Sequence, residues 1–198
     1  MSKRQPEKKG INVQIDKTNK VFLYVYSKDH PLPPEQRIRE CAKEFSSDMG
    51  IPFSADVPLL RTERGKPYFK GDELSFSITH SGDYWVCAVG KNPLGVDLQD
   101  ERPCKKEAIS RRYFHPQEKS FLKKNSWEPF FKVWAAKESY VKFTGEGISN
   151  RFSLFSTVNE CGEMIGVGSA RLSFIPFREG YVLCVCGENP GEIHLFYR

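Results

Sequence analysis

Long apolar runs, paired cysteines and strong charge of one sign are all missing from this sequence. No apolar stretch approaches the length needed to span a bilayer. The opening residues, MSKRQPEKKG, are polar and lack the apolar centre of a secretion signal. The six cysteines are scattered without a C-x-x-C pair, and Cys184 and Cys186 lie in an apolar run typical of buried strand thiols. We therefore expect a protein of the reducing cytoplasm, without a membrane segment.

Charge and composition narrow the class further. The net charge of +5 is modest and favours phosphates or an acidic partner. No RNP-like, zinc-finger or helix-turn-helix signature accompanies it. The hypothesis of a basic module that binds nucleic acid is therefore supported by charge alone. With 198 residues, 39% apolar and 13% aromatic, the chain is long enough and apolar enough for one large folded domain or two small ones.

Hydrophobic periodicity and turn residues predict a mixed α+β protein. The first twelve residues read as a flexible basic lead. Helical spacing covers Pro34 to Met49 and dominates again from about Cys104 to Phe143, with Pro116 at a first helical position. Alternation and turn signals predict strands at 21–26, 59–69, 74–80, 84–90, 94–99, 151–156, 169–175, 181–186 and 192–197. The third to fifth of these strands should form an antiparallel meander.

One pattern, Y-x-x-C-x-x-G-x-N-P, occurs twice in the chain, starting at Tyr84 and at Tyr181, and each copy is followed by a strand. Two unrelated hairpins with similar turn chemistry are one explanation. We favour a duplication: two similar halves, 13–102 and 103–198, each an antiparallel sheet packed with a long helix. Such halves would meet about a pseudo-twofold axis as a pseudodimer, with an active site at their interface.

The segment GVDLQD places two polar residues on one face of a strand. Because alternate residues face opposite sides, Val96 and Leu98 point into the core while Asp97 and Gln99 point together the other way. Gly95 leaves space for the close approach of a ligand or of another backbone. Taken alone, the hexapeptide is better explained as a strand end with a polar face.

The helix FFKVWAAKESYVK carries a glutamate in an unusual place. Glu138 and Lys142 are four residues apart, the spacing of an ordinary surface ion pair. On a helical wheel, however, Glu138 falls between Phe131 and Trp134, on the apolar flank. A carboxylate there needs a cation or hydrogen-bond donors. Lys142 is one partner to expect, and a metal ion shared with Asp97 is another.

Two further segments suit phosphate groups. Thr79 and His80 end a strand just before a turn with free amides, although a lone turn histidine is more often bonded to backbone. Lys66, in GKP, precedes a proline that favours an extended backbone. Together with two carboxylates, which suit Mg²⁺ and substrate phosphates, these residues describe Mg²⁺-assisted handling of a phosphorylated small molecule.

In order and spacing, FSITHSGDYWVCAV, GVDLQ, FHPQEKSFL and FKVWAAKESYVKFTGEGIS resemble the 4′-phosphopantetheinyl transferases of the Sfp type. The family signatures are G-[IV]-D-[ILV]-E and W-x-x-K-E-[AS]-x-x-K. The second signature is matched in full by Trp134, Lys137, Glu138, Ser139 and Lys142. The resemblance covers roughly residues 61–149 and implies a pseudodimeric α+β fold. It also implies transfer of the 4′-phosphopantetheine arm of coenzyme A to a serine of an acyl, peptidyl or aryl carrier protein.

The same resemblance implies roles for individual residues. Asp97 and Glu138 would bind Mg²⁺, and Glu138 would also be the base that takes the serine proton. Lys142 would neutralise the diphosphate. Lys66 would line the adenine end, and Glu118 resembles an acidic family position near the site. The 3′-phosphate would be held by Thr79, His80 and, in the first helix, Arg37.

Position 99 departs from the family pattern, which often has Glu where this chain has Gln99. We expect this amide or a water to complete the metal shell, with weaker affinity and with Mn²⁺ as an alternative metal. The departure also leaves room for a non-catalytic relative that binds coenzyme A or a carrier protein. The intact set of Asp97, Glu138 and Lys142 favours the enzyme, which we expect to be a monomer.

Overall fold

The computed structural model describes residues 19–71, 74–147 and 150–198. The basic lead predicted for residues 1–12 therefore lies outside the described residues. The elements follow in the order β1 (Lys20–Ser27), α1 (Pro34–Met49), β2 (Leu59–Arg61), β3 (Pro67–Phe69), β4 (Ser75–Ser81), β5 (Tyr84–Gly90), β6 (Leu94–Asp100), α2 (Lys106–Tyr113), α3 (Pro116–Lys124), α4 (Phe130–Thr144), the 3₁₀ helix η1 (Asn150–Ser153), β7 (Gly166–Val167), β8 (Ala170–Ile175), β9 (Tyr181–Gly187) and β10 (Glu192–Tyr197).

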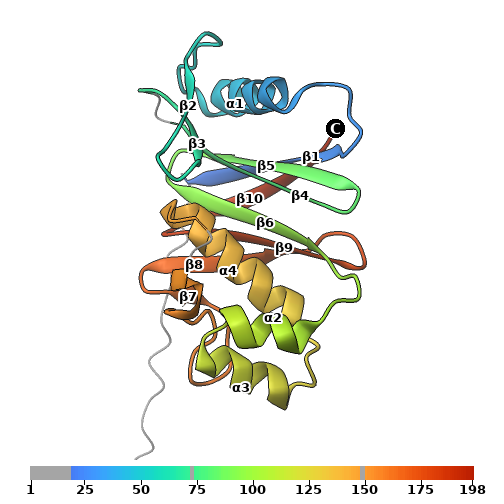
Figure 1. Cartoon of the computed structure of the whole chain (residues 1–198). Helices are drawn as coiled ribbons and strands as arrows, with labels where there is room; N and C mark the ends of the chain where they lie inside the picture. Colours follow the sequence, from blue (N-terminus) through green and yellow to red (C-terminus); the bar gives the residue numbers. More distant parts are fainter. Residues whose placement is uncertain (1–18, 72–73, 148–149) are drawn as a thin grey trace, which may run out of the picture.

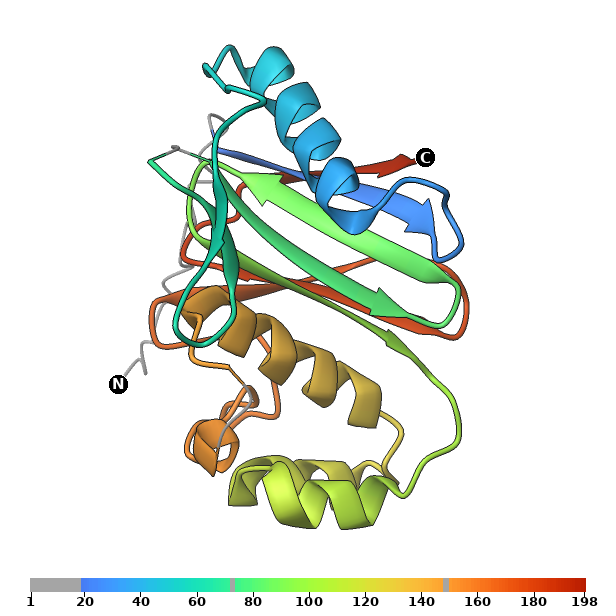
Figure 2. The same ribbon diagram turned by 45° about the horizontal axis from the view of Figure 1, so that its top comes forward.

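Two four-stranded sheets form the centre of the molecule. Sheet 1 has the strand order β10-β1-β5-β4, and sheet 2 has the order β6-β9-β8-β7. Helix α1 covers the outer face of sheet 1, and α4 covers sheet 2 with α2 and α3 beyond it (Figures 1 and 2). The result is a layered α+β fold, as predicted from the sequence.

Three apolar clusters fill the spaces between these layers. The first lies between α1 and sheet 1 and includes Ile38, Phe45 and Trp85. The second lies between sheet 2 and the helices α2 to α4 and is rich in aromatic rings. The third joins the two sheets through alternate residues of β1, β5, β6 and β9, such as Leu23, Val86 and Leu98. Because successive side chains of a strand point to opposite faces, each sheet has apolar residues packed on both of its faces.

The predicted meander is wrong at its third strand. Strands β4 and β5 form the expected antiparallel hairpin. Strand β6, however, leaves sheet 1 and pairs antiparallel with β9 in sheet 2. In the same way β10, which follows β9, crosses to sheet 1 and pairs with β1. That pairing is parallel, so sheet 1 is mixed and not purely antiparallel.

Most other elements agree with the sequence prediction. The 59–69 segment is a hairpin of β2 and β3, interrupted at GKP as expected. Helix α1 ends at Met49 and is capped by Gly50, which adopts the left-handed conformation that favours glycine. Pro116 is the first residue of α3. The predicted strand at 151–156 is wrong, because this segment begins with η1 and continues as irregular structure.

The two sheets are joined edge to edge by side chains. Strand β4 is one edge of sheet 1, and β6 is one edge of sheet 2. Three hydroxyls on β4 accept hydrogen bonds from alternate backbone amides of β6. We call these three side chains the hydroxyl ladder: Ser77 accepts from Val96 at 3.1 Å, Thr79 from Leu98 at 3.2 Å and Ser81 from Asp100 at 3.0 Å. The ladder pairs amides that an open sheet edge would leave without partners.

All six cysteines are free thiols, and Cys184 and Cys186 are buried in β9, as predicted. Among the helices that the structure describes, none combines the length and the apolar character required to cross a membrane.

Candidate active site

Asp97 is the centre of the candidate site. It lies on β6 with 3% of its surface exposed, facing α4 and the hydroxyl ladder. Its Oδ1 accepts from Lys142 Nζ at 2.7 Å and from the Thr79 hydroxyl at 3.2 Å. Its Oδ2 accepts from Gln99 Nε2 at 2.6 Å. The predicted shared face of Asp97 and Gln99 is therefore confirmed, and both carboxylate oxygens are bonded.

The absence of a side chain at Gly95 allows α4 to pack directly against β6. A Cβ on Gly95 would lie 2.0 Å from the Ser139 carbonyl oxygen and 2.4 Å from the Phe143 amide nitrogen. The space predicted beside Gly95 is thus filled by the backbone of α4 and not by a ligand. This close approach places Glu138 and Lys142, which α4 carries, beside Asp97.

Glu138 is the second acidic group of the site. It is 6% exposed, which confirms the burial inferred from its position on the helical wheel. Burial and the nearby charge of Asp97 raise the pKa of Glu138 to about 7, against a smaller opposing effect of Lys142. Within the described part of the chain, no hydrogen-bond donor contacts this carboxylate. A buried carboxylate without a donor, next to a second carboxylate, is suited to a bound cation.

Lys142 pairs with Asp97 and not with Glu138. Besides Asp97, its ammonium donates to the carbonyl oxygen of Val96 at 3.0 Å. The i,i+4 spacing on α4 therefore does not produce the ion pair that this spacing often forms on an exposed helix. The side chain of Lys142 is 28% exposed, so the ammonium remains within reach of solvent.

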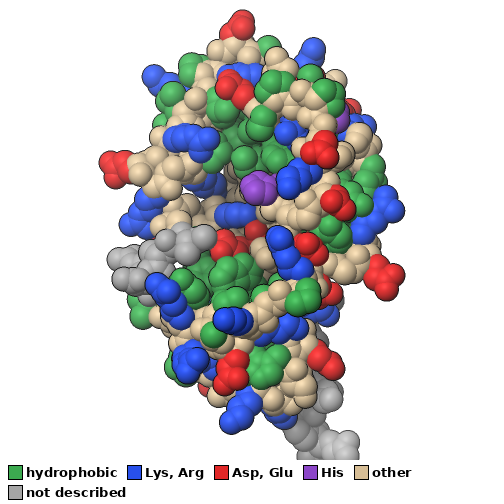
Figure 3. Space-filling model, turned by 45° about the vertical axis from the view of Figure 1, so that its right-hand side comes forward, with side chains coloured by type: hydrophobic (Ala, Val, Ile, Leu, Met, Phe, Trp, Pro, Cys, Tyr) green, Lys and Arg blue, Asp and Glu red, His purple; other side chains and the backbone are tan. Residues whose placement is uncertain are grey.

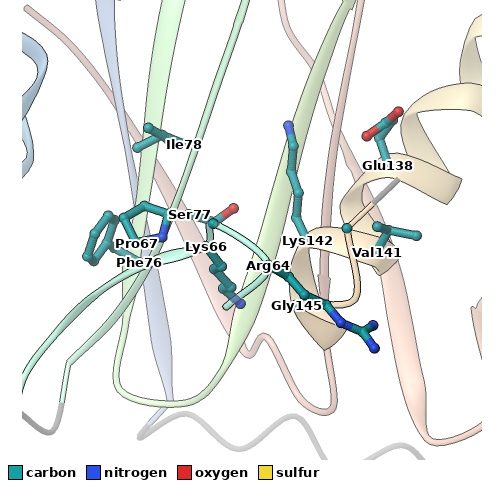
Figure 4. Close-up of a pocket in the computed structure, with 12 residues that line it drawn as sticks. Arg64, Lys66, Pro67, Phe76, Ser77, Ile78, Glu138, Val141, Lys142 and Gly145 are labelled. Carbon is teal, nitrogen blue, oxygen red and sulfur yellow. The ribbon is translucent and has the colours of Figure 1, made fainter. Parts of the chain in front are cut away.

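A cavity of about 240 Å³ opens beside these groups. Figure 4 shows Glu138, Val141 and Lys142 of α4 on one side, with Pro67, Phe76 and Ile78 opposite them. Lys66 lies between the two sides in the same view. The cavity thus combines apolar walls with two ammonium groups and a carboxylate, a composition that suits an amphipathic anionic ligand.

The two residues predicted beside each other at the end of β4 face opposite ways. Successive side chains of a strand alternate, so Thr79 points to Asp97 while His80 lies on the α1 side of sheet 1. Thr79 is buried and His80 is exposed. The structure therefore does not bring the Thr79 hydroxyl and the His80 imidazole together.

Arg37 lies on the same side of sheet 1 as His80. Its guanidinium carbon is 4.5 Å from the centre of the Trp85 ring, and Trp85 is the cross-strand partner of His80. Arg37 is 5% exposed, yet its Nε and Nη1 atoms have no hydrogen-bond partner among the described residues. Buried donors without partners are costly and are expected to meet a ligand or water.

Basic side chains gather around a hollow on one face of the molecule, with acidic side chains among them. Figure 3 shows a hollow near the middle of one face, with lysine and arginine side chains in and around it and a histidine at its edge. Apolar side chains lie above and below the hollow in the same view. Such a surface would attract a ligand that carries several phosphates.

Glu118 forms a buried ion pair with Lys137 and is not among the residues that line the cavity. Its carboxylate lies 2.9 Å from Lys137 Nζ, and both side chains are fully buried. It also accepts from the amide and hydroxyl of Thr157 and from the amide of His115, which it caps at the start of α3. Lys137 is a residue of the matched motif, but the sequence pattern by itself predicts no role for it.

Among the described residues, no group of three or more His, Cys, Asp or Glu side chains is arranged to hold a metal ion. The donor set next to the cavity is instead the pair Asp97 and Glu138, with Gln99 adjacent. One or two carboxylates with substrate phosphates are what Mg²⁺ prefers. These side chains therefore fit a cation that completes its shell from a ligand and water.

The pKa of Glu138 leads to a prediction about stability. Because the folded protein raises this pKa from 4.5 to about 7, stabilisation by the protonated form is complete below 4.5 and is lost as pH rises through 7. In metal-free protein, the free energy of unfolding of Glu138→Gln should fall by roughly 2–3 kcal/mol less across this pH window than that of wild type. Urea unfolding on both sides of the pH window would measure it, with the exposed Glu128→Gln as control. Equal pH dependence in Glu138→Gln and wild type would contradict the prediction.

A protein family and several known proteins match this sequence. A family model described as the 4′-phosphopantetheinyl transferase superfamily matches residues 93–186. A 4′-phosphopantetheinyl transferase of Bacillus subtilis is 30% identical over 193 residues, covering 90% of this chain and 83% of the relative.

More distant relatives carry related names. The 4′-phosphopantetheinyl transferase Sfp of Bacillus subtilis strain 168 is 29% identical over 147 residues, which cover 69% of this chain and 65% of the relative. The L-aminoadipate-semialdehyde dehydrogenase-phosphopantetheinyl transferase of Mus musculus is 27% identical over 157 residues, covering 69% of this chain and 50% of the relative. The matched family region includes Asp97, Glu138 and Lys142, and the chain therefore belongs to the 4′-phosphopantetheinyl transferase superfamily.

Proposed function

We propose that this protein transfers the 4′-phosphopantetheine arm of coenzyme A to a serine of an apo carrier protein and releases adenosine 3′,5′-bisphosphate. The observation that carries the proposal is the buried pair of carboxylates, Asp97 and Glu138, beside a cavity that also contains Lys142, in a chain of this superfamily. Acyl, peptidyl and aryl carrier proteins all present the required serine.

The reaction exchanges one phosphorus–oxygen bond for another. The serine oxygen forms a bond to the phosphorus next to the pantetheine arm, and the bond from that phosphorus to the bridging oxygen breaks. Glu138, which lines the cavity, accepts the serine proton as the general base. The electron pair of the broken bond stays on the departing bisphosphate. Lys142 neutralises the diphosphate and the charge that develops on the leaving group.

Asp97 and Glu138 are the proposed ligands of Mg²⁺, with Mn²⁺ as an alternative. When bound, the metal ion would supply positive charge to the diphosphate. Gln99 donates its amide hydrogen to Asp97, which suits a weak or water-mediated part in the metal shell. The role of these residues is to hold two negative charges in one buried place, which a cation then compensates.

The other proposed contacts bind the nucleotide end. Arg37 and His80 are proposed for the 3′-phosphate, supported by the unpartnered guanidinium nitrogens of Arg37 and by their shared neighbour Trp85. The backbone at Lys66 is proposed for the adenine end. A contact of Thr79 with the 3′-phosphate stays a prediction, since its hydroxyl here bonds to Asp97. A role for Glu118 near the site is proposed only through its partner Lys137, which precedes Glu138 on α4.

The repeated Tyr-Cys pattern supports a pseudodimer of two related halves. Its two copies are β5 and β9, and each is followed by a strand, β6 or β10, that joins the other sheet. The first residues of the copies, Tyr84 and Tyr181, meet with ring centres 5.2 Å apart. The halves at 13–102 and 103–198 would then exchange one strand each, with Asp97 delivered by the first half to the helix of the second.

A cytoplasmic location, a monomeric state and the absence of nucleic-acid and membrane partners stay predictions from the sequence. The transfer itself is tested by incubating the protein with coenzyme A, Mg²⁺ and a panel of apo carrier proteins. Mass spectrometry should show the mass of one phosphopantetheine arm added to at least one carrier, and no addition when coenzyme A is omitted. No mass shift on any carrier would favour a non-catalytic relative that binds coenzyme A or a carrier protein.

A further inference from the structure

The Lys66 side chain connects three elements that surround the candidate site. Lys66 lies on the turn between β2 and β3, where its amide donates to the Thr62 hydroxyl at 3.0 Å. Its ammonium leaves the hairpin and donates to the carbonyl oxygen of Leu94 at 3.3 Å and to that of Phe143 at 3.2 Å. Leu94 begins β6, and Phe143 is in the last turn of α4.

Both carbonyl groups need a donor from outside their own element. The last four carbonyls of a helix have no intrahelical partner, which applies to Phe143. Leu94 belongs to the edge of β6 that faces β4, where side chains take the place of a neighbouring strand. On that edge the hydroxyl ladder pairs the amides, while Lys66 and Lys142 pair the carbonyls of Leu94 and Val96. The single ammonium group of Lys66 therefore donates hydrogen bonds both to the β6 edge and to the end of α4.

The contact is partly buried and supported by its surroundings. Burial lowers the pKa of Lys66, so the charged ammonium depends on its two carbonyl partners. A Cβ on Gly145, the residue that ends α4, would lie 3.5 Å from Lys66 Cδ. Next to it on the hairpin, Arg64 donates to the carbonyl of Glu146 at 3.1 Å. The hairpin is thus fastened to the end of α4 at more than one point.

We propose that the Lys66 side chain is a positioning residue, which holds β6 and α4 together so that Asp97 and Glu138 stay at the separation a shared cation needs. The inference rests on the proposed function, because it presumes that these two carboxylates bind a metal ion. It assigns to the lysine side chain a task different from contact with coenzyme A. Lys66 acts through backbone carbonyls, and its ammonium does not touch the cation.

The test is Mn²⁺ binding in the absence of coenzyme A, followed by the electron paramagnetic resonance signal of free Mn²⁺. Lys66→Met keeps the length of the side chain and removes the donors. We expect it to weaken Mn²⁺ binding about tenfold, the size typical for residues that orient metal ligands. Lys66→Arg, which keeps a cation with N–H donors, should restore most of the affinity. Lys70→Met, on an exposed lysine of the same hairpin, should bind Mn²⁺ like wild type.

Steady-state transfer assays on the same proteins separate the alternatives. A positioning role predicts a lower kcat in Lys66→Met together with the weaker metal binding. Wild-type Mn²⁺ affinity in Lys66→Met, with a higher KM for coenzyme A alone, would overturn the inference and leave Lys66 as a ligand contact. If wild-type protein transfers the arm but binds no Mn²⁺, Asp97 and Glu138 do not share a cation, and the inference about Lys66 is wrong. The proposed transferase activity would still stand.

Discussion

Replacing Asp97 with Asn should lower the rate of phosphopantetheine transfer at least about 100-fold, as expected when one preorganised charged group is removed from an active site. Asn has the same shape and still accepts a hydrogen bond from Thr79, but it carries no charge for a cation or for Lys142. The protein should remain folded, since Lys142 is 28% exposed and keeps solvent and the Val96 carbonyl as partners. Transfer rates at saturating coenzyme A, together with circular dichroism, would check both statements.

The matched control is Asp100→Asn on the same strand. Asp100 is partly exposed, and the nearest cation is Arg102, at 3.7 Å. Its replacement should change the transfer rate by less than about twofold, because weak surface ion pairs contribute little. A transfer rate near that of wild type in Asp97→Asn would show that the metal site is placed wrongly.

Replacing Lys137 with Met should destabilise the protein by about 3–5 kcal/mol, the effect of removing one partner from a buried ion pair. The Glu118 carboxylate would stay fully buried without its counter-charge, held only by Thr157 and His115. The lost ammonium also contacts aromatic rings, the nearest being that of Phe155 at 4.0 Å. The free energy of urea unfolding measures the change directly.

Two further variants make this prediction specific. The double variant Lys137→Met with Glu118→Gln should recover part of the loss, because it removes the unpaired charge. Lys132→Met, on an exposed lysine of the same helix, should change stability by less than about 0.5 kcal/mol. A loss below about 1 kcal/mol in Lys137→Met would mean that the buried pair contributes little beyond packing.

Local signals in the sequence predicted most elements and the layered class of the fold. Pro34 and Gly50 mark the two ends of α1, and GKP marks the turn between β2 and β3. The exchange of β6 and β10 between the sheets was not predictable in this way. Alternation along a strand shows which residues face the core, but it does not identify the neighbouring strand. The segment after Arg151 resembles a strand for a different reason: a short apolar run does not distinguish a strand from other structure.

The burial and orientation of single site residues are predicted more reliably from the sequence than the contacts between them. The wheel position of Glu138 and the alternation of Asp97 with Gln99 correctly indicated burial and a shared face. Contacts between distant segments were missed, such as Lys142 with Asp97 and Glu118 with Lys137. Long flexible side chains reach partners that spacing along one helix does not reveal. The hydroxyl ladder had a visible signal, since hydroxyl residues alternate along SFSITHS.

The exchanged strands also constrain how the molecule is made. Strand β1 lies between β5 and β10, and its Lys20 is paired with Glu192. During synthesis, sheet 1 therefore lacks an outer strand until residues 192–197 have been made, although its other strands are complete long before. Contacts between such distant segments slow folding. In the interval β1 presents an open, apolar edge, so chaperone binding and aggregation should be most frequent for nascent chains that stop short of β10.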